Sequence, residues 1–355
     1  MSILIDLSML RHPWCGLGQV ALNYGRWYGA HTAGLTPGHE VTLLVPRGFA
    51  GHFGAHVHYL EAHDCYRAMP WLMPRFDLWH SIHQLSPFRP SVRSTLRLLT
   101  VHDVNFMYEK PEAKRRRYLR RLQHECDRSA LVCFISRFAM EDALRYLHVD
   151  APMQVVYNGV EQLTEGVQRM PQGVDAGRPF LLSLGVLKAK KNVHTLLPMM
   201  KCLPQYDLLI AGDDSDPYAD RIRREAGCCG NVRVLGPVDE AGRRWLYAHC
   251  QALLFPSLYE GFGLPVVEAM QWGKPVFCSR QTALPEIGGD AACYFDSFEP
   301  RHMASQVLRT LREHTPGRSR ELQSYAARFS YDRHMTQYQE LYRRLLDGGV
   351  GGSLS

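Results

Sequence analysis

Two glutamates, Glu260 and Glu268, stand eight positions apart in the segment 255–270, which reads Phe-Pro-Ser-Leu-Tyr-Glu-Gly-Phe-Gly-Leu-Pro-Val-Val-Glu-Ala-Met. Carboxylates repel phosphate, but they readily accept hydrogen bonds from hydroxyl groups. Two acids at this spacing are weak evidence by themselves, since such pairs usually mark the solvated face of a helix. Their chemistry nevertheless suits a ligand that presents sugar hydroxyls.

The residues around these acids predict how they are positioned. The apolar run 252–255 predicts a short buried strand, and Gly261 and Gly263 leave the following turn open to a ligand. Pro265 suits the first position of a helix, whose unpaired N–H groups and dipole attract a phosphate. We expect the first acid in the loop and the second in the first helical turn. Hydroxyl acceptors beside a phosphate-attracting helix start fit a sugar attached to a nucleotide.

A second candidate site lies upstream of the two acids. The apolar run 180–185 ends in Gly185, and Lys190 and Lys191 follow it ahead of an apolar helical pattern. A strand, a glycine and a lysine cluster before a helix form an anion site. For this run taken alone, a solvated lysine-rich loop is the alternative.

The segment 255–270 resembles the donor-site signature of retaining GT-B glycosyltransferases of family 4, which include sucrose synthases, phosphatidylinositol mannosyltransferases and lipopolysaccharide glycosyltransferases. The resemblance spans nearly the whole chain and is most specific over residues 253–286. It implies that Glu268 binds the ribose hydroxyls, Glu260 the donor sugar ring and Lys191 the diphosphate. Such electrostatic stabilisation of the leaving group can replace a metal ion.

The same resemblance singles out residues in the first half of the chain. Gly16 and Gly18 fall in a glycine-rich loop that closes on the donor diphosphate in the family, and Cys15 replaces a further glycine. His102 falls on the acceptor-domain histidine that faces the donor sugar. From the residues alone, His102 could be a general base, a hydrogen-bonding clamp or an ordinary loop histidine among 17. Val186 stands where many relatives carry an arginine.

These considerations define the expected site. The expected catalytic residues are His102, Lys191 and Glu260. The expected donor-binding residues are Gly16, Gly18, Gly185, Lys190, Lys191, Glu260, Gly261, Phe262, Gly263, Leu264 and Glu268. No metal ligands and no cofactor are expected.

Two sequence patterns resemble metal-binding motifs, but neither is interpreted as a metal site. Asp213-Asp-Ser-Asp216 contains the Asp-x-Asp of metal-dependent GT-A enzymes, but acids after a strand commonly cap the next helix. The histidine pairs at 56/58 and 80/83 have no carboxylate or cysteine partner at a spacing that completes a metal site.

Strand patterns alternate with helical patterns along the chain, which predicts parallel α/β sheets. The resemblance implies a GT-B fold, in which an acceptor-binding and a nucleotide-sugar-binding Rossmann-like domain face each other across a cleft. The expected division is an N-terminal domain 1–160, a linker 161–178, a C-terminal domain 179–330, a helix 331–347 that crosses back to the first domain and a flexible tail 348–355. Strands are expected at 3–7, 41–45, 56–60, 77–80, 96–101, 131–135, 153–157, 180–185, 207–212, 231–236, 252–255 and 275–278.

Composition narrows the class of protein. A chain of 355 residues is long enough for two domains, and 46% hydrophobic with 21% charged residues is typical of soluble globular proteins. No apolar run reaches the roughly 20 residues of a spanning helix, and the N-terminus lacks the basic lead of a secretory signal. Ten cysteines without a Cys-x-x-Cys pattern do not suggest a disulfide scaffold. We therefore expect a cytoplasmic protein.

The net charge of +6 is mild, and its largest concentration lies in residues 110–121. The basic run Lys114–Arg121 could face anionic lipid at the inner side of the plasma membrane, or it could be a solvated helix face. Nucleic-acid binding is not expected, because no stacking-aromatic or recognition-helix pattern accompanies the basic run.

The resemblance implies a retaining, metal-independent hexosyltransferase that uses a nucleotide sugar, with GDP-mannose as the leading donor by analogy and UDP-sugars as the closest alternative. The expected acceptor is a hydroxyl of a glycan or lipid-linked oligosaccharide in bacterial surface polysaccharide or lipopolysaccharide synthesis. The other candidates are a sugar-nucleotide epimerase and a noncatalytic glycan-binding module of the same fold. A Rossmann oxidoreductase is disfavoured, since no Gly-x-Gly-x-x-Gly follows a strand.

Overall fold

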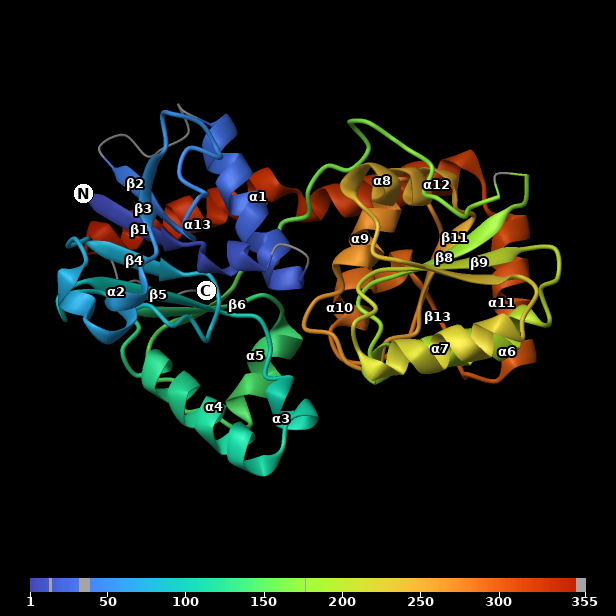
Figure 1. Cartoon of the computed structure of the whole chain (residues 1–355), viewed down its shortest axis with the longest axis horizontal. Helices are drawn as coiled ribbons and strands as arrows, with labels where there is room; N and C mark the ends of the chain where they lie inside the picture. Colours follow the sequence, from blue (N-terminus) through green and yellow to red (C-terminus); the bar gives the residue numbers. More distant parts are fainter. Residues whose placement is uncertain (13–14, 32–38, 176, 349–355) are drawn as a thin grey trace. The chain divides into compact units, whose positions relative to one another are not determined.

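The computed structural model describes residues 1–12, 15–31, 39–175 and 177–348. The chain forms two units, each built on its own parallel β-sheet with helices around it (Figure 1). The first unit holds Met1–Gly159 together with the C-terminal segment from Tyr331, and the second holds Val160–Ser330.

In the described part of the first unit, the sheet has seven parallel strands in the order β3-β2-β1-β4-β5-β6-β7. The strands are β1 (Ser2–Asp6), β2 (Glu40–Val45), β3 (His58–Glu61), β4 (Leu78–Ser81), β5 (Leu96–Val101), β6 (Leu131–Phe134) and β7 (Met153–Val155). The helices are α1 (Gly16–Ala30), α2 (Asp64–Ala68), α3 (Phe106–Glu109), α4 (Glu112–Cys126), α5 (Arg137–Leu144) and α13 (Tyr331–Leu346), with short 3-10 turns at Ser8–Arg11 and Pro70–Leu72.

Alternating residues of the central strands bury both faces of this sheet. In β5, Leu98 packs in the cluster that includes residues of α1 and α13, whereas Leu99 packs in a second cluster with Leu122 of α4. Successive side chains of a strand point to opposite faces, so both faces are covered by helices. Near-continuous apolar runs in the sequence are the expected signature of such strands.

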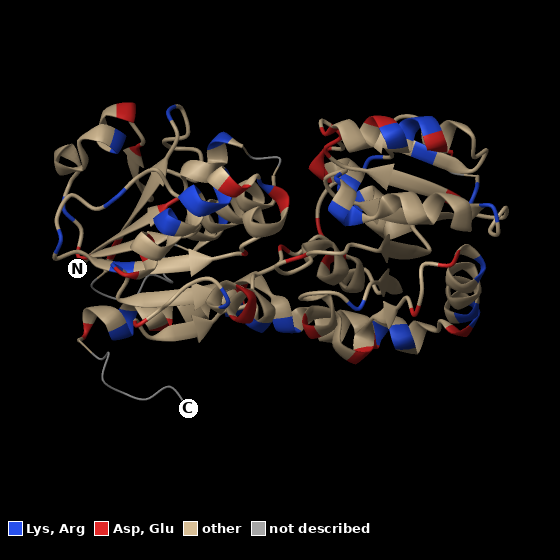
Figure 2. Cartoon of the chain, turned by 90° about the horizontal axis from the view of Figure 1, so that it is seen from below, with Lys and Arg blue, Asp and Glu red and all other residues tan. Residues whose placement is uncertain are grey.

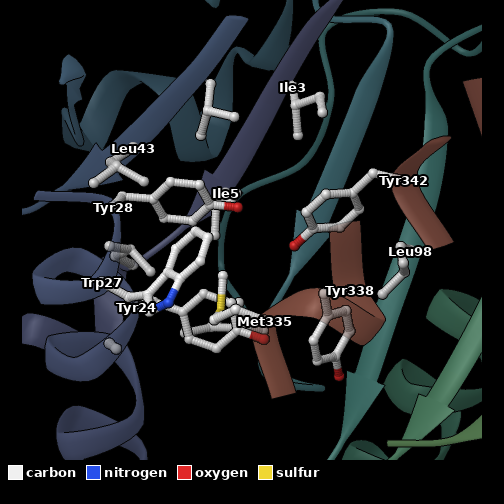
Figure 3. Packing of buried hydrophobic residues seen from close by; sticks show 14 of the residues in the cluster. Ile3, Ile5, Tyr24, Trp27, Tyr28, Leu43, Leu98, Met335, Tyr338 and Tyr342 are labelled. Atoms are coloured by element: carbon white, nitrogen blue, oxygen red, sulfur yellow. The ribbon is translucent and has the colours of Figure 1, made fainter. Parts of the chain in front are cut away.

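The C-terminal helix α13 completes the core of the first unit. Figure 3 shows Met335, Tyr338 and Tyr342 of this helix in the same cluster as Ile5 and Tyr24. All five side chains are at most 1% exposed. The helix therefore contributes core residues to a sheet whose last strand, β7, ends at Val155, far earlier in the sequence than Tyr331.

Polar groups are buried inside this aromatic cluster and bond to one another. His80 of the central strand β4 contacts the Tyr342 hydroxyl through Nδ1 at 2.6 Å and Thr100 Oγ1 through Nε2 at 2.8 Å. The Tyr338 hydroxyl lies 2.8 Å from Thr100 Oγ1. His334 Nδ1 lies 2.7 Å from the Tyr157 carbonyl oxygen. Buried polar groups are tolerated because they are hydrogen-bonded.

In the described part of the second unit, the sheet has six parallel strands in the order β10-β9-β8-β11-β12-β13. The strands are β8 (Phe180–Leu184), β9 (Asp207–Ala211), β10 (Val232–Gly236), β11 (Ala252–Phe255), β12 (Val276–Cys278) and β13 (Cys293–Tyr294). The α-helices are α6 (Leu196–Met200), α7 (Pro217–Gly227), α8 (Glu240–His249), α9 (Leu264–Gln271), α10 (Leu284–Gly288), α11 (Pro300–Glu313) and α12 (Pro316–Ala326). The 3-10 turns are η3 (Ala189–Lys191), η4 (Val193–Thr195), η5 (Gly289–Ala291) and η6 (Ala327–Phe329).

Two boundaries differ from the sequence-based expectations. Residues 161–178, predicted to be a linker, belong to the second unit: Leu163 is fully buried and its N–H donates to Gln271 Oε1 at 3.1 Å. A glycine-rich, polar composition therefore does not mark a free connection here. The predicted tail 348–355 lies, apart from Gly348, outside the described residues. None of the described helices is long and apolar enough to span a membrane.

Candidate functional site

The strand order of the second sheet reverses between β8 and β11, which lie side by side. In open parallel sheets, ligands bind beyond the carboxyl ends of the strands at this point. The segment after β8 carries Gly185 and Lys191, and the segment after β11 carries Glu260. The sequence predicts Lys191 as anion-binding and Glu260 as hydroxyl-binding in two separate segments. These two residues are 69 positions apart, and they meet at one edge of the sheet.

Lys191 and Glu260 form an ion pair between Nζ and Oε1, and their side chains are only 16% and 13% exposed. Lys191 Nζ also lies 5.1 Å from the centre of the buried Phe255 ring. The two loops are tied by their backbones as well, because Leu258 N–H donates to the Lys190 carbonyl oxygen at 2.7 Å. Partial burial strengthens the attraction between the charges. A lysine held here can meet the charge of a diphosphate, as the sequence predicts.

Helix α9 begins directly beside this pair. Gly263 is its N-cap residue with φ +103°, a left-handed conformation that favours glycine, and Pro265 lies in the first turn. Glu268 is the fifth residue of α9 and so lies in its second turn, where the sequence predicts the first turn. The difference arises because Leu264, not Pro265, is the first helical residue. The helix N-terminus follows the Glu260 loop and offers unpaired N–H groups to an anion.

The side chain of Glu268 is buried, at 7% exposure, and has two partners on α8. The Tyr247 hydroxyl donates to Glu268 Oε2 at 2.7 Å, and Arg243 Nη1 lies 3.6 Å from Glu268 Oε1. No role is predicted for these two residues from the sequence. Their spacing of four positions places both residues on one helical face. This spacing was the only feature of the sequence that could have indicated a shared partner.

Thr282 supports the loop that carries Glu260. Its Oγ1 accepts a hydrogen bond from the Glu260 N–H at 3.0 Å, and its φ of +56° is unusual for a β-branched residue. Backbone strain of this kind costs about 1–3 kcal/mol and persists where the surroundings impose it. The strained backbone of Thr282 therefore lowers the stability of the folded protein, while its hydrogen bond fixes the loop that carries Glu260.

Replacing Thr282 by glycine is expected to separate stability from activity. Glycine relieves the positive φ but removes the Oγ1 acceptor, so the free energy of unfolding should stay equal or rise while the transferase activity that the resemblance implies falls by about tenfold. Urea denaturation and initial rates measure the two effects. Thr282→Ser, which keeps the hydroxyl, is the control and should retain activity; equal activity of both variants would contradict the assigned role.

Gly185 and Gly212 bring two strand ends into close contact below the lysine loop. A Cβ at Gly212, whose φ is +139°, would lie 2.0 Å from the Gly185 carbonyl oxygen. Neither backbone can move far, because the Gly185 N–H donates to the Ala211 carbonyl oxygen at 2.9 Å. Gly185, an expected donor-binding residue, thus lies at the sheet edge, with Lys191 Nζ 4.0 Å from where its own Cβ would be.

Gly212→Ala is expected to lower the free energy of unfolding of the second unit by about 3 kcal/mol, because it adds both a backbone clash and an unfavourable φ. Urea denaturation measures the loss. Gly227→Ala at the end of α7, where a Cβ would meet nothing within 4 Å, is the matched control and should be neutral or slightly stabilising. Equal stabilities of the two variants would refute the clash.

His102 follows β5 in the first unit and is buried. Its Nε2 lies 2.8 Å from the Ile82 carbonyl oxygen, and its backbone N–H donates to Gln84 Oε1 at 3.1 Å. Because a carbonyl only accepts, Nε2 carries the proton and Nδ1 of the neutral ring is an acceptor. Burial lowers the pKa of His102 to about 4. A neutral hydrogen-bonding clamp therefore fits this geometry better than a general base.

The remaining expected residues differ in their settings. Gly16 is the first residue of α1 and Gly18 lies in its first turn, so the predicted glycine-rich loop is a helix start whose N-cap Cys15 accepts the Gly18 N–H through Sγ at 3.4 Å. The apolar pattern that begins only at Val20 explains the difference.

Phe262, another expected donor-binding residue, is 3% exposed and packs edge-on against Phe329, with 5.8 Å between the ring centres. Its side chain is therefore part of the core.

The acids after β9 cap a helix, as the sequence predicts. Asp216 is the N-cap of α7 and its Oδ1 accepts the Tyr218 N–H at 3.0 Å. Within the described residues, no group of three or more His, Cys, Asp or Glu side chains is arranged to hold a metal ion. The prediction of a helix cap is confirmed for Asp216, whereas Asp214 pairs with Arg223 of the same helix.

Comparison with solved structures defines the class of this fold. The structure aligns over 97% of its length with 99% of the Anabaena protein HepE, solved in complex with UDP and glucose, at a TM-score of 0.72 and 16% identity. It aligns equally well, with a TM-score of 0.71 and 18% identity, with sucrose-phosphate synthase from Thermosynechococcus elongatus, covering 98% of this chain and all of the other. The fold is that of the GT-B glycosyltransferases.

Sequence comparison points to the same class. Residues 166–329, which lie within the second unit, match the family described as glycosyl transferases group 1. It is 29% identical to the O-antigen chain mannosyltransferase B of Escherichia coli over 274 residues, which cover 69% of this chain and 70% of the relative.

Two further relatives are matched over smaller parts. The serotype-specific mannosyltransferase WbdA of Escherichia coli is 26% identical over 62% of this chain, but this spans only 30% of that relative. The GDP-mannose:cellobiosyl-diphosphopolyprenol alpha-mannosyltransferase of Komagataeibacter xylinus is 25% identical, covering 58% of this chain and 54% of the relative.

Proposed function

We propose that this protein transfers a hexose, with retention of the anomeric configuration, from a nucleotide diphosphate sugar to a hydroxyl of a glycan or lipid-linked acceptor. The leading donor is GDP-mannose, and the leading process is bacterial surface polysaccharide or lipopolysaccharide synthesis. The observation that carries the proposal is the Lys191–Glu260 pair at the point where the strand order of the second sheet reverses. Mannosyltransferase relatives, one named for GDP-mannose, support the choice of donor.

The chemistry follows from the charges at this edge. In the free protein Lys191 and Glu260 neutralise each other; a bound donor would part them, with the ammonium group facing the diphosphate and the carboxylate accepting sugar hydroxyls. The N-terminus of α9 adds positive potential where negative charge develops on the leaving group. These groups can stabilise the departing diphosphate without a metal ion, and attack from the same face requires no covalent nucleophile.

Glu268 would accept hydrogen bonds from the ribose hydroxyls through the lone pairs that Tyr247 leaves available. The donor-binding role of Glu268, like those of Gly16 and Gly18, is carried over from the family, and the geometry of α9 is compatible with it. His102 would contribute its unprotonated Nδ1 as an acceptor for a hydroxyl hydrogen.

Contact with anionic lipid is proposed for the basic helix α4 of the first unit. Figure 2 shows Lys and Arg gathered along this helix. Arg116 is 74% exposed, and its only ion pair found in the described structure is with Glu112 on the same helix. Exposed cations at this density attract anionic headgroups, each contributing about 1 kcal/mol near a membrane surface.

Product analysis with a library of donors tests the proposal. Incubation with GDP-mannose and a mannose-terminated, lipid-linked oligosaccharide is expected to give an acceptor one hexose heavier, joined through an α-linkage. UDP-hexoses are the second donor class, supported by the structural likeness to a protein solved with UDP and glucose. Free sugar without acceptor would instead indicate an epimerase, and glycan binding without turnover would indicate a noncatalytic module.

A further inference from the structure

Two side chains of α8 contact the Glu268 carboxylate. Arg243 and Tyr247 are four residues apart and reach Glu268 Oε1 and Oε2, respectively. We propose that Arg243 and Tyr247 are positioning residues that fix the Glu268 carboxylate for a ribose diol, and that they thereby set a preference for ribonucleotide over 2′-deoxyribonucleotide donors. This inference rests on the proposed function.

The two contacts leave the carboxylate able to bind a ligand. Tyr247 takes one lone pair of Oε2 at 2.7 Å, whereas the 3.6 Å between Arg243 Nη1 and Glu268 Oε1 is an ion pair too long for a hydrogen bond. A carboxylate offers about four lone-pair positions, so most of its capacity remains for two hydroxyls. Arg243 therefore balances the charge of Glu268 without occupying it.

The guanidinium of Arg243 is itself held in place from the other side. Its Nη2 lies 3.5 Å from Glu161 Oε2, so the group stands between two carboxylates while its side chain is only 17% exposed. Burial lowers the pKa of Arg243, but attraction by Glu268 and Glu161 outweighs it and the net shift is upward. Burial and Glu268 both raise the pKa of Tyr247, which keeps its hydroxyl proton as a donor.

Packing alone does not explain this arrangement. The Nε atoms of Arg243 and of the neighbouring Arg244 are both buried and make no hydrogen bond within the described part of the chain, and of the two it is Arg243 that pairs with Glu268. An unsatisfied buried donor is costly, and an apolar side chain of similar volume would avoid the cost. Burying the charged side chain of Arg243 therefore costs stability. Positioning the Glu268 carboxylate explains why a charged side chain is nevertheless present.

Calorimetric titration with GDP and 2′-deoxy-GDP, and with UDP and 2′-deoxy-UDP, tests the proposal on the full chain. In the wild type, the better-binding base is expected to show about tenfold tighter binding of the ribonucleotide, since a hydrogen bond to a charged group is lost in the deoxy form. Arg243→Gln and Tyr247→Phe are expected to reduce this ratio to within about twofold. Arg244→Gln is the matched control, because Arg244 pairs with Glu240 and Glu161 but not with Glu268.

The outcomes separate this inference from the proposed function. If Glu268→Ala weakens nucleotide binding while Arg243→Gln and Tyr247→Phe keep the tenfold ratio, or if the wild type shows no ratio, the inference is overturned and the function stands. If Glu268→Ala binds GDP and UDP as tightly as the wild type, or if neither nucleotide binds the wild type, the proposed function itself fails. Tyr247→Phe removes one oxygen only, so it carries the test if Arg243→Gln does not fold.

Discussion

Replacing Lys191 by alanine is expected to lower the turnover number for glycosyl transfer by about 100- to 1000-fold, which is the usual effect of removing one preorganised group that stabilises developing charge. Lys191 is the last residue of the 3-10 turn η3 and pairs with Glu260, and no other described lysine pairs with this carboxylate. The KM for the donor should also rise, because the ammonium group would contact the diphosphate in the ground state as well. Initial rates over a range of donor concentrations measure both effects.

The control for this experiment must account for Glu260, which loses its ion-pair partner when Lys191 is replaced. Without Lys191, the Glu260 carboxylate is partly buried and unpaired, which itself destabilises the loop. The double replacement of both residues should therefore be no less stable than Lys191→Ala alone, yet equally inactive. Lys201→Ala, at an exposed position after α6, should keep full activity. Turnover of Lys191→Ala within twofold of the wild type, with the fold intact, would exclude the proposed role.

Protonation of His102 and His334 is expected to destabilise the first unit by about 5 kcal/mol between pH 7 and pH 4.5. Burial lowers the pKa of both groups to about 4, and it also lowers the pKa of His80, whose protonation adds to this loss. In the unfolded chain these groups take up a proton below about pH 6.5. The neutral rings therefore contribute their full stabilisation above pH 6.5, and this stabilisation is lost as the pH falls toward 4. At pH 4.5 the free energy of unfolding is lower by about 2.5 kcal/mol for each of His102 and His334.

His334→Gln tests this pH dependence in one residue. Glutamine can still donate to the Tyr157 carbonyl and accept from the Tyr24 hydroxyl, which His334 contacts at 2.7 and 3.1 Å, but it does not titrate. About half of the expected loss should disappear in this variant. Urea denaturation at the two pH values, followed by hydrogen exchange of the first-unit strands, measures the change. His52→Gln at an exposed position is the control; a pH dependence of His334→Gln equal to that of the wild type would be the contrary result.

Much of the fold follows from patterns that are local in the sequence. The strand β11 has the bounds that the sequence predicts, because the apolar run ends at Phe255 before Pro256. The meeting of Lys191 and Glu260 was also predictable, since residues after neighbouring parallel strands converge on one edge of the sheet.

Other features depend on tertiary packing that periodicity does not reveal. An arginine on a helix normally faces solvent, so nothing in the sequence predicts that Arg243 is buried against Glu268. Gly16 begins α1 although glycine is a poor helix former, because the apolar face that follows is buried against the sheet. The positive φ of Thr282 contradicts its local preference altogether. Arg243 and Thr282, both in the second unit, contact the two glutamates of the proposed donor site, where strain and buried charge are expected.

The most direct test of this account is a crystal structure of the protein with GDP-mannose or its product GDP. The account predicts that the diphosphate lies within hydrogen-bonding distance of Lys191 Nζ and of the N–H groups that open α9, with the Lys191–Glu260 pair separated and the ribose hydroxyls on Glu268. A nucleotide bound elsewhere on the second unit, with the ion pair of the free protein intact, would contradict it.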